Sequence, residues 1–111
     1  MHSKPNLLFI CSDQQRTDTI GAYGNDWIET PALNELASRS FVFENAYVTQ
    51  PVCSPARSTM MTGLYPHSAG VVRNSQPGRP FSNLFPDVKT IAEMVSDDYV
   101  CGKYGKWHLG D

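Results

Sequence analysis

The residues best equipped for chemistry lie in one short stretch, residues 53–57, which reads Cys-Ser-Pro-Ala-Arg. Cys53 supplies a nucleophilic side chain, and Arg57 supplies a fixed positive charge. Side chains four residues apart on a helix are neighbours, so the two can share one site. A nucleophile beside a cation indicates a site that handles an anion. The alternative is a structural cysteine, because free cysteines are often simply buried.

A short helix is needed to hold this pair in place. Ser54 is a good N-cap, Pro55 suits the first helical position, and Gly63 suits a helix stop. The pattern therefore predicts a helix over residues 55–62. Cys53 would then lie just before the helix N-terminus, where backbone N–H groups favour negative charge.

A second group of polar residues follows the apolar run at residues 7–11. Such a run is typical of a parallel strand buried on both faces. Ligands bind at the carboxyl ends of the strands in open α/β sheets, which is where Asp13 and Gln14 lie. A carboxylate and an amide carbonyl suit a hard cation, Ca²⁺ or Mg²⁺. The alternative is a solvated acid beside an amide that caps a turn.

A third group, Lys106 and His108, follows a segment at residues 99–104 that we expect to be a strand. Alternation along an extended backbone predicts that these two side chains lie on the same side. The alternative is a solvent-facing lysine and a packed histidine. A further histidine, His67, falls in a loop and is interpreted as structural.

The remaining elements complete an α/β pattern. Thr30 and Pro31 predict the start of a helix, in which Leu33, Leu36 and Ala37 recur at helical spacing and form one apolar face. Thr90 predicts the cap of another helix, which is expected to end at Asp97 and Asp98. Residues 41–43 and 46–48 are expected to be extended, and residues 73–86 to form a long surface loop. The order strand, helix, strand, helix, helix, strand favours a sheet flanked by helices.

Composition excludes several classes of function. The chain has 111 residues, a net charge of −2 and a pI of about 5.8, so nothing indicates a nucleic-acid partner. No apolar run approaches the roughly 20 residues of a membrane span. Three widely spaced cysteines form neither a disulfide framework nor a zinc pattern. No secretory apolar region precedes residue 7, so a cytoplasmic location is expected, or a periplasmic or secreted one if the true N-terminus lies upstream.

The three polar groups together resemble motifs of the type I sulfatases. Residues 53–57 match the signature Cys-x-Pro-x-Arg and continue through Thr59, Thr62 and Gly63. The Asp-Gln-Gln-Arg-Thr-Asp run that begins at residue 13 is similar to the first metal motif. The Gly-Lys-Trp-His-Leu-Gly run at residues 105–110 is similar to a third motif. In the commoner family form two acids are adjacent in the metal motif, whereas residue 14 is glutamine here.

This resemblance implies a mechanism. Cys53 would be oxidised to formylglycine by a maturation enzyme, and the aldehyde hydrate would attack a sulfate ester. A divalent metal, Ca²⁺ in the first place or Mg²⁺, would be held by Asp13, Gln14 and the modified Cys53. Arg57 would position the hydrate, and Lys106 and His108 would line the sulfate. The partners implied are this maturation enzyme and a small-molecule or carbohydrate sulfate ester, with the oligomeric state left open.

The resemblance covers residues 4–110 but only the N-terminal portion of the family's catalytic domain. We therefore expect residues 1–111 to be an incomplete part of an alkaline-phosphatase-like α/β sandwich with a mostly parallel sheet, and to be inactive alone. Two alternatives stay open. The Asp-Gln form of the metal motif also fits phosphonate monoester or phosphodiester hydrolases of the same superfamily. The chain could also be a non-catalytic piece or a small binding module.

Overall fold

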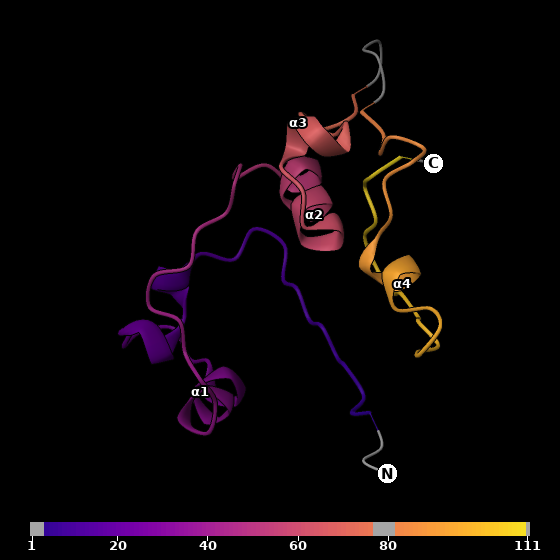
Figure 1. Ribbon diagram of the computed structural model, residues 1–111. Coiled ribbons are helices and arrows are strands. Elements are labelled where there is room, and N and C mark those ends of the chain that lie inside the picture. The colour runs from indigo at the N-terminus through magenta and orange to yellow at the C-terminus, as the bar shows by residue number, and fades with distance from the viewer. Residues whose placement is uncertain (1–3, 77–81, 111) are drawn as a thin grey trace. The chain divides into compact units, whose positions relative to one another are not determined.

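The computed structural model describes residues 4–76 and 82–110, and its contacts separate the chain into two compact units. The first unit is Met1–Ala46 and the second is Tyr47–Asp111. Helices of the first unit are η1 (Thr17–Thr19), η2 (Gly21–Tyr23) and α1 (Pro31–Ser38) (Figure 1). Helices of the second unit are α2 (Cys53–Thr62), α3 (Pro66–Ala69) and α4 (Ile91–Met94).

Helix α1 begins at Pro31 with Thr30 as its N-cap residue, which confirms the predicted start. The Thr30 hydroxyl accepts a hydrogen bond from the Gly21 backbone N–H at 2.9 Å, and this bond ties η2 to α1. The Tyr23 hydroxyl donates to the Phe43 carbonyl at 2.9 Å, so the chain that leaves α1 is held against η2 as well. These bonds hold the first unit together around the start of α1.

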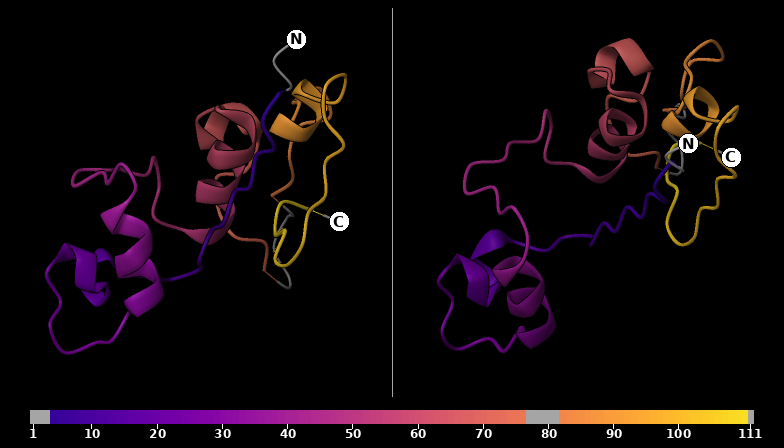
Figure 2. Two further views of the ribbon diagram at one scale, coloured as in Figure 1. Left: turned by 90° about the horizontal axis from the view of Figure 1, so that it is seen from below. Right: turned by 60° about the horizontal axis from the view of Figure 1, so that its bottom comes forward.

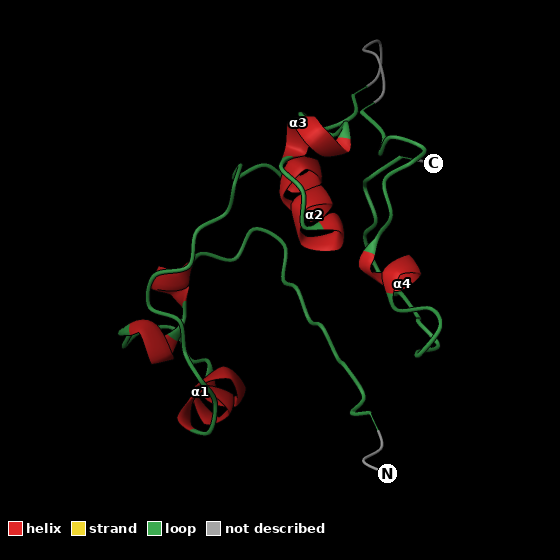
Figure 3. Ribbon diagram, viewed as in Figure 1, coloured by secondary structure: helices red, strands yellow, loops and turns green. Residues whose placement is uncertain are grey.

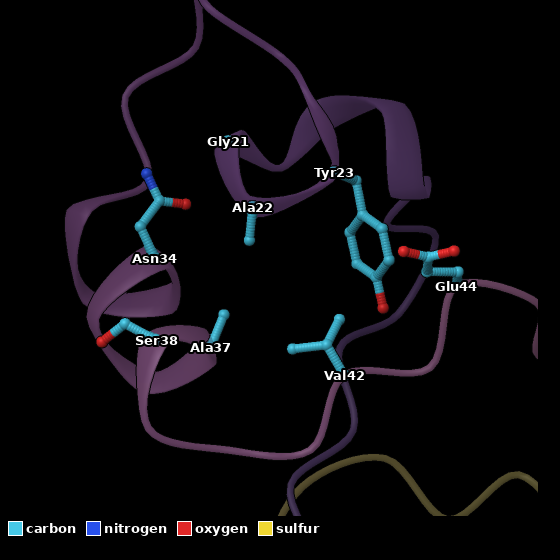
Figure 4. A pocket seen from close by; sticks show the side chains of 8 residues that line it. All are labelled: Gly21, Ala22, Tyr23, Asn34, Ala37, Ser38, Val42 and Glu44. Carbon is cyan, nitrogen blue, oxygen red and sulfur yellow. The ribbon is translucent and has the colours of Figure 1, made fainter.

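A shallow, open hollow lies between η2 and α1. The side chains of Ala22, Ala37 and Val42 point into it, with Tyr23 on one side and Asn34 on the other (Figure 4). A second, more apolar hollow adjoins it and is lined by Leu33, Leu36 and Ala37 among others, the three positions that the helical spacing placed on one face. The predicted apolar face of α1 is therefore confirmed.

Helix α2 begins two residues earlier than predicted. Its N-cap is Val52, and Cys53 is the first helical residue, so Ser54 is not the cap. Pro55 is tolerated because the first backbone N–H to donate within this helix belongs to Ala56, which bonds to the Val52 carbonyl at 2.9 Å. The predicted end is correct, since Gly63 adopts a left-handed conformation (φ 71°) directly after Thr62.

The buried face of α2 consists of small residues. Ser54, Ser58 and Thr62 recur every four positions along this face and are all buried. Two of their hydroxyls are satisfied within the helix: Ser58 donates to the Pro55 carbonyl at 2.8 Å and Thr62 to the Ser58 carbonyl at 2.6 Å. Small side chains let other backbone approach closely, and α3 packs against α2 (Figure 2).

Ala69, Val71 and Leu109 form the apolar core of the second unit among the described residues. Backbone hydrogen bonds connect the segments that carry them. The Phe85 N–H donates to the Ala69 carbonyl at 3.0 Å, and the Leu84 N–H donates to the Leu109 carbonyl at 3.4 Å. Residues 84–85 therefore join the end of α3 to the segment that carries Lys106 and His108.

Helix α4 confirms the predicted cap at Thr90 but is shorter than expected. It ends at Met94, ahead of Asp97 and Asp98. The Thr90 backbone N–H and hydroxyl both donate to the Glu93 carboxylate, at 2.7 and 2.9 Å. Residues 73–76 and 82–86 of the predicted loop lie outside helices and strands, while residues 77–81 lie outside the described part of the chain.

The expected strands are not formed in the described parts of the chain, where Figure 3 shows helices and loops alone. Segments 7–11, 41–43, 46–48 and 99–104 lack the ladder bonds of a sheet. Leu8 and Ile10, expected in a strand buried on both faces, are 86% and 81% exposed. A buried parallel strand requires strands at its edges and layers on both faces, and the described residues supply neither. In the same residues, no helix is both long and apolar enough to cross a membrane.

Candidate active site

Cys53 occupies the first turn of α2 and is half-buried as a free thiol. Its position in the helix, rather than ahead of it, corrects the sequence-based placement. Arg57 lies one turn later on the same helix and is also half-buried. Because side chains four residues apart on a helix are neighbours, the thiol of Cys53 and the guanidinium of Arg57 are expected to lie close together along α2.

The amide groups around the start of α2 are largely engaged by other parts of the second unit. The Val52 N–H donates to the Gln50 carbonyl at 2.9 Å, and the Ser54 N–H donates to the Asn74 side-chain oxygen Oδ1 at 2.9 Å. Pro55 has no N–H. The helix terminus therefore offers an anion fewer amide donors than its sequence indicated, and positive side chains become the main source of positive charge.

Arg57 connects α2 to the segment with Lys106 and His108. Its Nη1 donates to the Lys106 backbone carbonyl at 2.8 Å. Charge-assisted hydrogen bonds of this kind are stronger than neutral ones, so the guanidinium holds the remote segment against the helix. The structure thus brings together Arg57 and Lys106, two residues that belong to separate sequence motifs.

Backbone turns, rather than strand alternation, position Lys106 and His108. Gly105 and His108 have positive φ angles of 84° and 62°, so the segment is not extended and the alternation argument is wrong here. A left-handed conformation is uncommon for a residue with a side chain and is often found where a site imposes it. The neighbouring Leu109 is only 3% exposed and anchors the turn.

The His108 ring places a polar atom in the interior of the second unit. Nδ1 is buried and has no hydrogen-bond partner within residues 4–76 and 82–110. An unsatisfied buried polar atom costs about 1–3 kcal/mol, so a group outside these residues is expected to pair with it. The Lys106 side chain is exposed. His67 lies in α3 and not in the predicted loop; its side chain is exposed and its ring stacks on that of Tyr65, with the ring centroids 5.8 Å apart.

Asp13 and Gln14 belong to the first unit and are both exposed. Gln14 has a positive φ angle of 58°, the only other such residue besides His108 that is not glycine in the described chain. Their carboxylate and amide oxygens are the donors that Ca²⁺ and Mg²⁺ prefer, so the pair fits a hard cation chemically. The described residues contain no cluster of three or more His, Cys, Asp or Glu side chains suited to a metal, so further ligands are needed.

Sequence reasoning missed two polar residues whose side chains hold the segments around the start of α2. Asn74 accepts from the Ser54 N–H, and the Gln50 side chain donates to the Val72 carbonyl at 3.2 Å. Asn74 lies in a segment that composition marks as loop, and its partner is 20 residues away. No local periodicity links two such positions, so the sequence carried no signal for this contact.

Comparison with known proteins places these motifs in a family. The sulfatase family model matches residues 5–110. The chain is 41% identical over 107 residues to an ulvan-active sulfatase of Formosa agariphila, 38% over 114 residues to arylsulfatase J of Mus musculus and 33% over 114 residues to steryl-sulfatase of Homo sapiens. These matches cover 96–97% of this chain but 18–20% of the relatives. No solved structure matches it.

The chain therefore belongs to the sulfatase family, which confirms the resemblance carried by the three motifs. It spans about a fifth of the length of the curated relatives it matches. Membership implies the α/β class of fold. The mostly parallel sheet itself stays a prediction, because the described residues contain helices and loops and no strand.

Proposed function

We propose that the full-length protein hydrolyses sulfate esters with a formylglycine made from Cys53. The observation that carries this proposal is the bond from Arg57 to the Lys106 carbonyl at 2.8 Å. It joins the nucleophile's helix to the segment with the second cation and the histidine. Membership of the sulfatase family supports the same reaction.

The chain's own residues would divide the work of the reaction. Water replaces the alcohol on sulfur: the bond from sulfur to the leaving oxygen breaks, and that oxygen takes up a proton. Arg57 would provide fixed positive charge beside residue 53, and the Lys106 ammonium would hold a non-bridging sulfate oxygen as a compact point charge. His108 would hold a proton on a ring nitrogen and share it with the reacting oxygen atoms.

Two further groups would take part in the reaction besides these side chains. Formylglycine at position 53 supplies an aldehyde hydrate as the nucleophile, and a divalent cation supplies positive charge that favours its ionised form. Asp13 and Gln14 would contribute oxygen ligands to that cation, with Ca²⁺ favoured over Mg²⁺. Asp13→Asn should lower the metal content of the purified protein, whereas Asp26→Asn in the same unit should not.

The test begins with the modification. The full-length protein is expressed with and without a formylglycine-generating enzyme, and the peptide that contains Cys53 is weighed by mass spectrometry. We expect the aldehyde at Cys53 and the thiol at Cys11 and Cys101, with turnover of an aryl sulfate in the modified sample alone. An unmodified thiol after co-expression with several such enzymes would count against the proposal, and Cys53→Ala provides the matched negative control.

A second candidate is hydrolysis of phosphonate monoesters or phosphodiesters. One observation favours it: residue 14 is glutamine, where the commoner sulfatase motif has an acid. Replacing an anionic ligand by a neutral one changes the charge at the metal and hence the preferred anion. The kcat/KM values for an aryl sulfate and a matched aryl phosphonate on the same preparation distinguish the two candidates.

A further inference from the structure

We propose that Asn74 is a positioning residue for Cys53, acting through the first turn of α2. Its Oδ1 accepts the Ser54 N–H at 2.9 Å, directly after the nucleophile position in the chain. Nothing in the sequence motifs assigns a role to this residue. The inference rests on the proposed function only in treating Cys53 as the nucleophile position, because the hydrogen bond itself lies within the polypeptide.

The start of α2 lacks a cap of its own. Val52, the N-cap residue, makes no side-chain capping bond, and Ser54 lies inside the helix with its side chain fully buried. A helix that begins without its own cap leaves backbone donors that other groups must satisfy. Asn74 supplies such an acceptor from 20 residues further along the chain. It therefore fulfils the role that the sequence had assigned to Ser54.

Asn74 is held in place by the segment that precedes it in the chain. It follows Val71, which is fully buried, and the Val71 N–H donates to the Pro66 carbonyl of α3 at 3.0 Å. Between the two, the Val72 carbonyl accepts the Gln50 side chain at 3.2 Å. Residues 71–74 are thus fixed to the unit's core at one end and to the start of α2 at the other.

Cys53 lies between two of these contacts in the chain. Gln50 bonds to residue 72 on the N-terminal side of Cys53, and Ser54 bonds to Asn74 on its C-terminal side. The two contacts together restrict the backbone of the turn that carries the nucleophile. A catalytic side chain is only as well positioned as the residues that support it, because a misplacement of about 1 Å can cost roughly a hundredfold in rate.

The test measures the thiol directly, without any enzymatic turnover. The full-length protein is expressed without the maturation enzyme, and alkylation of Cys53 by iodoacetamide is followed by peptide mass spectrometry. The exposed thiols Cys11 and Cys101 serve as internal references. Loss of a helix cap typically corresponds to a three- to tenfold change in a local equilibrium, so Asn74→Ala should accelerate Cys53 labelling by about that factor.

Two further variants separate positioning from general destabilisation. Asn74→Asp keeps an acceptor oxygen near the helix N-terminus and should restore labelling to the wild-type rate or below. Asn83→Ala, a matched asparagine in the same unit whose side chain lies against Gly110, should leave Cys53 labelling unchanged. The proposal would be overturned if Cys53 were labelled at the wild-type rate in Asn74→Ala. It would also be overturned if Cys53 were labelled as fast in Asn74→Asp as in Asn74→Ala.

Hydrogen exchange on the wild-type protein gives an independent result that needs no variant to fold. The Ser54 amide should be protected from exchange because it donates to Asn74. Exchange at the rate of an unstructured amide would also overturn the inference. Absence of sulfate ester turnover in the modified protein would instead contradict the proposed function and leave the labelling result intact.

Discussion

Arg57 donates from Nη1 to the backbone carbonyl of Lys106 at 2.8 Å, although the two residues are 49 positions apart in the sequence. The contact links helix α2 to a segment that has no regular secondary structure of its own. Because the acceptor is a main-chain atom, the bond fixes the path of the backbone at Lys106. Arg57 is thereby expected to contribute both charge and position to the site.

Replacing Arg57 tests this double role in the full-length, formylglycine-bearing protein. Arg57→Ala should lower kcat for an aryl sulfate by about 10²–10³, the usual loss when one stabilising electrostatic group is removed. Arg57→Lys keeps the charge but not the planar donor fork, so its activity should recover only in part. Steady-state kinetics provide the measurement. The control is Arg39→Ala, an exposed arginine 3.7 Å from Glu35 on α1. Wild-type turnover by Arg57→Ala would refute the role.

The 111 residues on their own should bind divalent metal weakly and show no turnover. Ca²⁺ takes 6–8 oxygen ligands, whereas the proposed ligands in the first unit are two side chains, Asp13 and Gln14. Large apolar side chains such as Leu8, Ile10 and Phe41 are strongly exposed, so self-association is also expected. Calorimetric titration with Ca²⁺ and Mg²⁺, light scattering and an aryl sulfate assay test this. Micromolar affinity with turnover from a monomer would show that the ligand count is wrong.

The start of α4 should lose stability in acid. Hydrogen bonds from the Thr90 backbone N–H and then from the Thr90 hydroxyl lower the pKa of Glu93 below its ordinary value. A depressed folded-state pKa means that the stabilisation is complete above the ordinary pKa and is lost as the pH falls through the lowered one. An NMR titration of Glu93 and of the α4 amides measures this. Glu93→Gln, which cannot ionise, should abolish the dependence.

Glycine should be required at position 63 because of the backbone conformation there, and not because a larger side chain would clash with its surroundings. Its φ angle is 71°, and a Cβ added there would meet nothing within 4 Å. Gly63→Ala is therefore expected to destabilise the second unit by about 1 kcal/mol, the usual cost of a left-handed conformation for an L-residue. Gly63→Asn should cost less, because asparagine tolerates this region. Denaturant unfolding provides the comparison, and an unchanged midpoint for Gly63→Ala would contradict the prediction.

Local signals in the sequence correctly predicted the starts of α1 and α4 and the end of α2, whereas η1, η2 and α3 were not predicted. Thr30 with Pro31, Gly63 and Thr90 each mark a helix boundary that the structure contains, because capping and left-handed conformations depend on residues a few positions apart. The start of α2 was misplaced by the same reasoning. Ser54 has the right side chain for a cap, but its amide pairs with Asn74, a partner that local pattern cannot reveal.

The sequence by itself determined the family and the set of chemical groups: Cys53 and Arg57 four residues apart, Asp13 with Gln14, and Lys106 near His108. Each of these motifs is a contiguous stretch of sequence, so it can be recognised without knowledge of the fold. Tertiary structure alone decided that Arg57 holds the Lys106 carbonyl, that Asn74 holds the Ser54 amide and that His108 turns into a left-handed conformation. These arrangements depend on hydrogen bonds between segments distant in sequence and on the burial of Leu109, and no property of a single short segment encodes them.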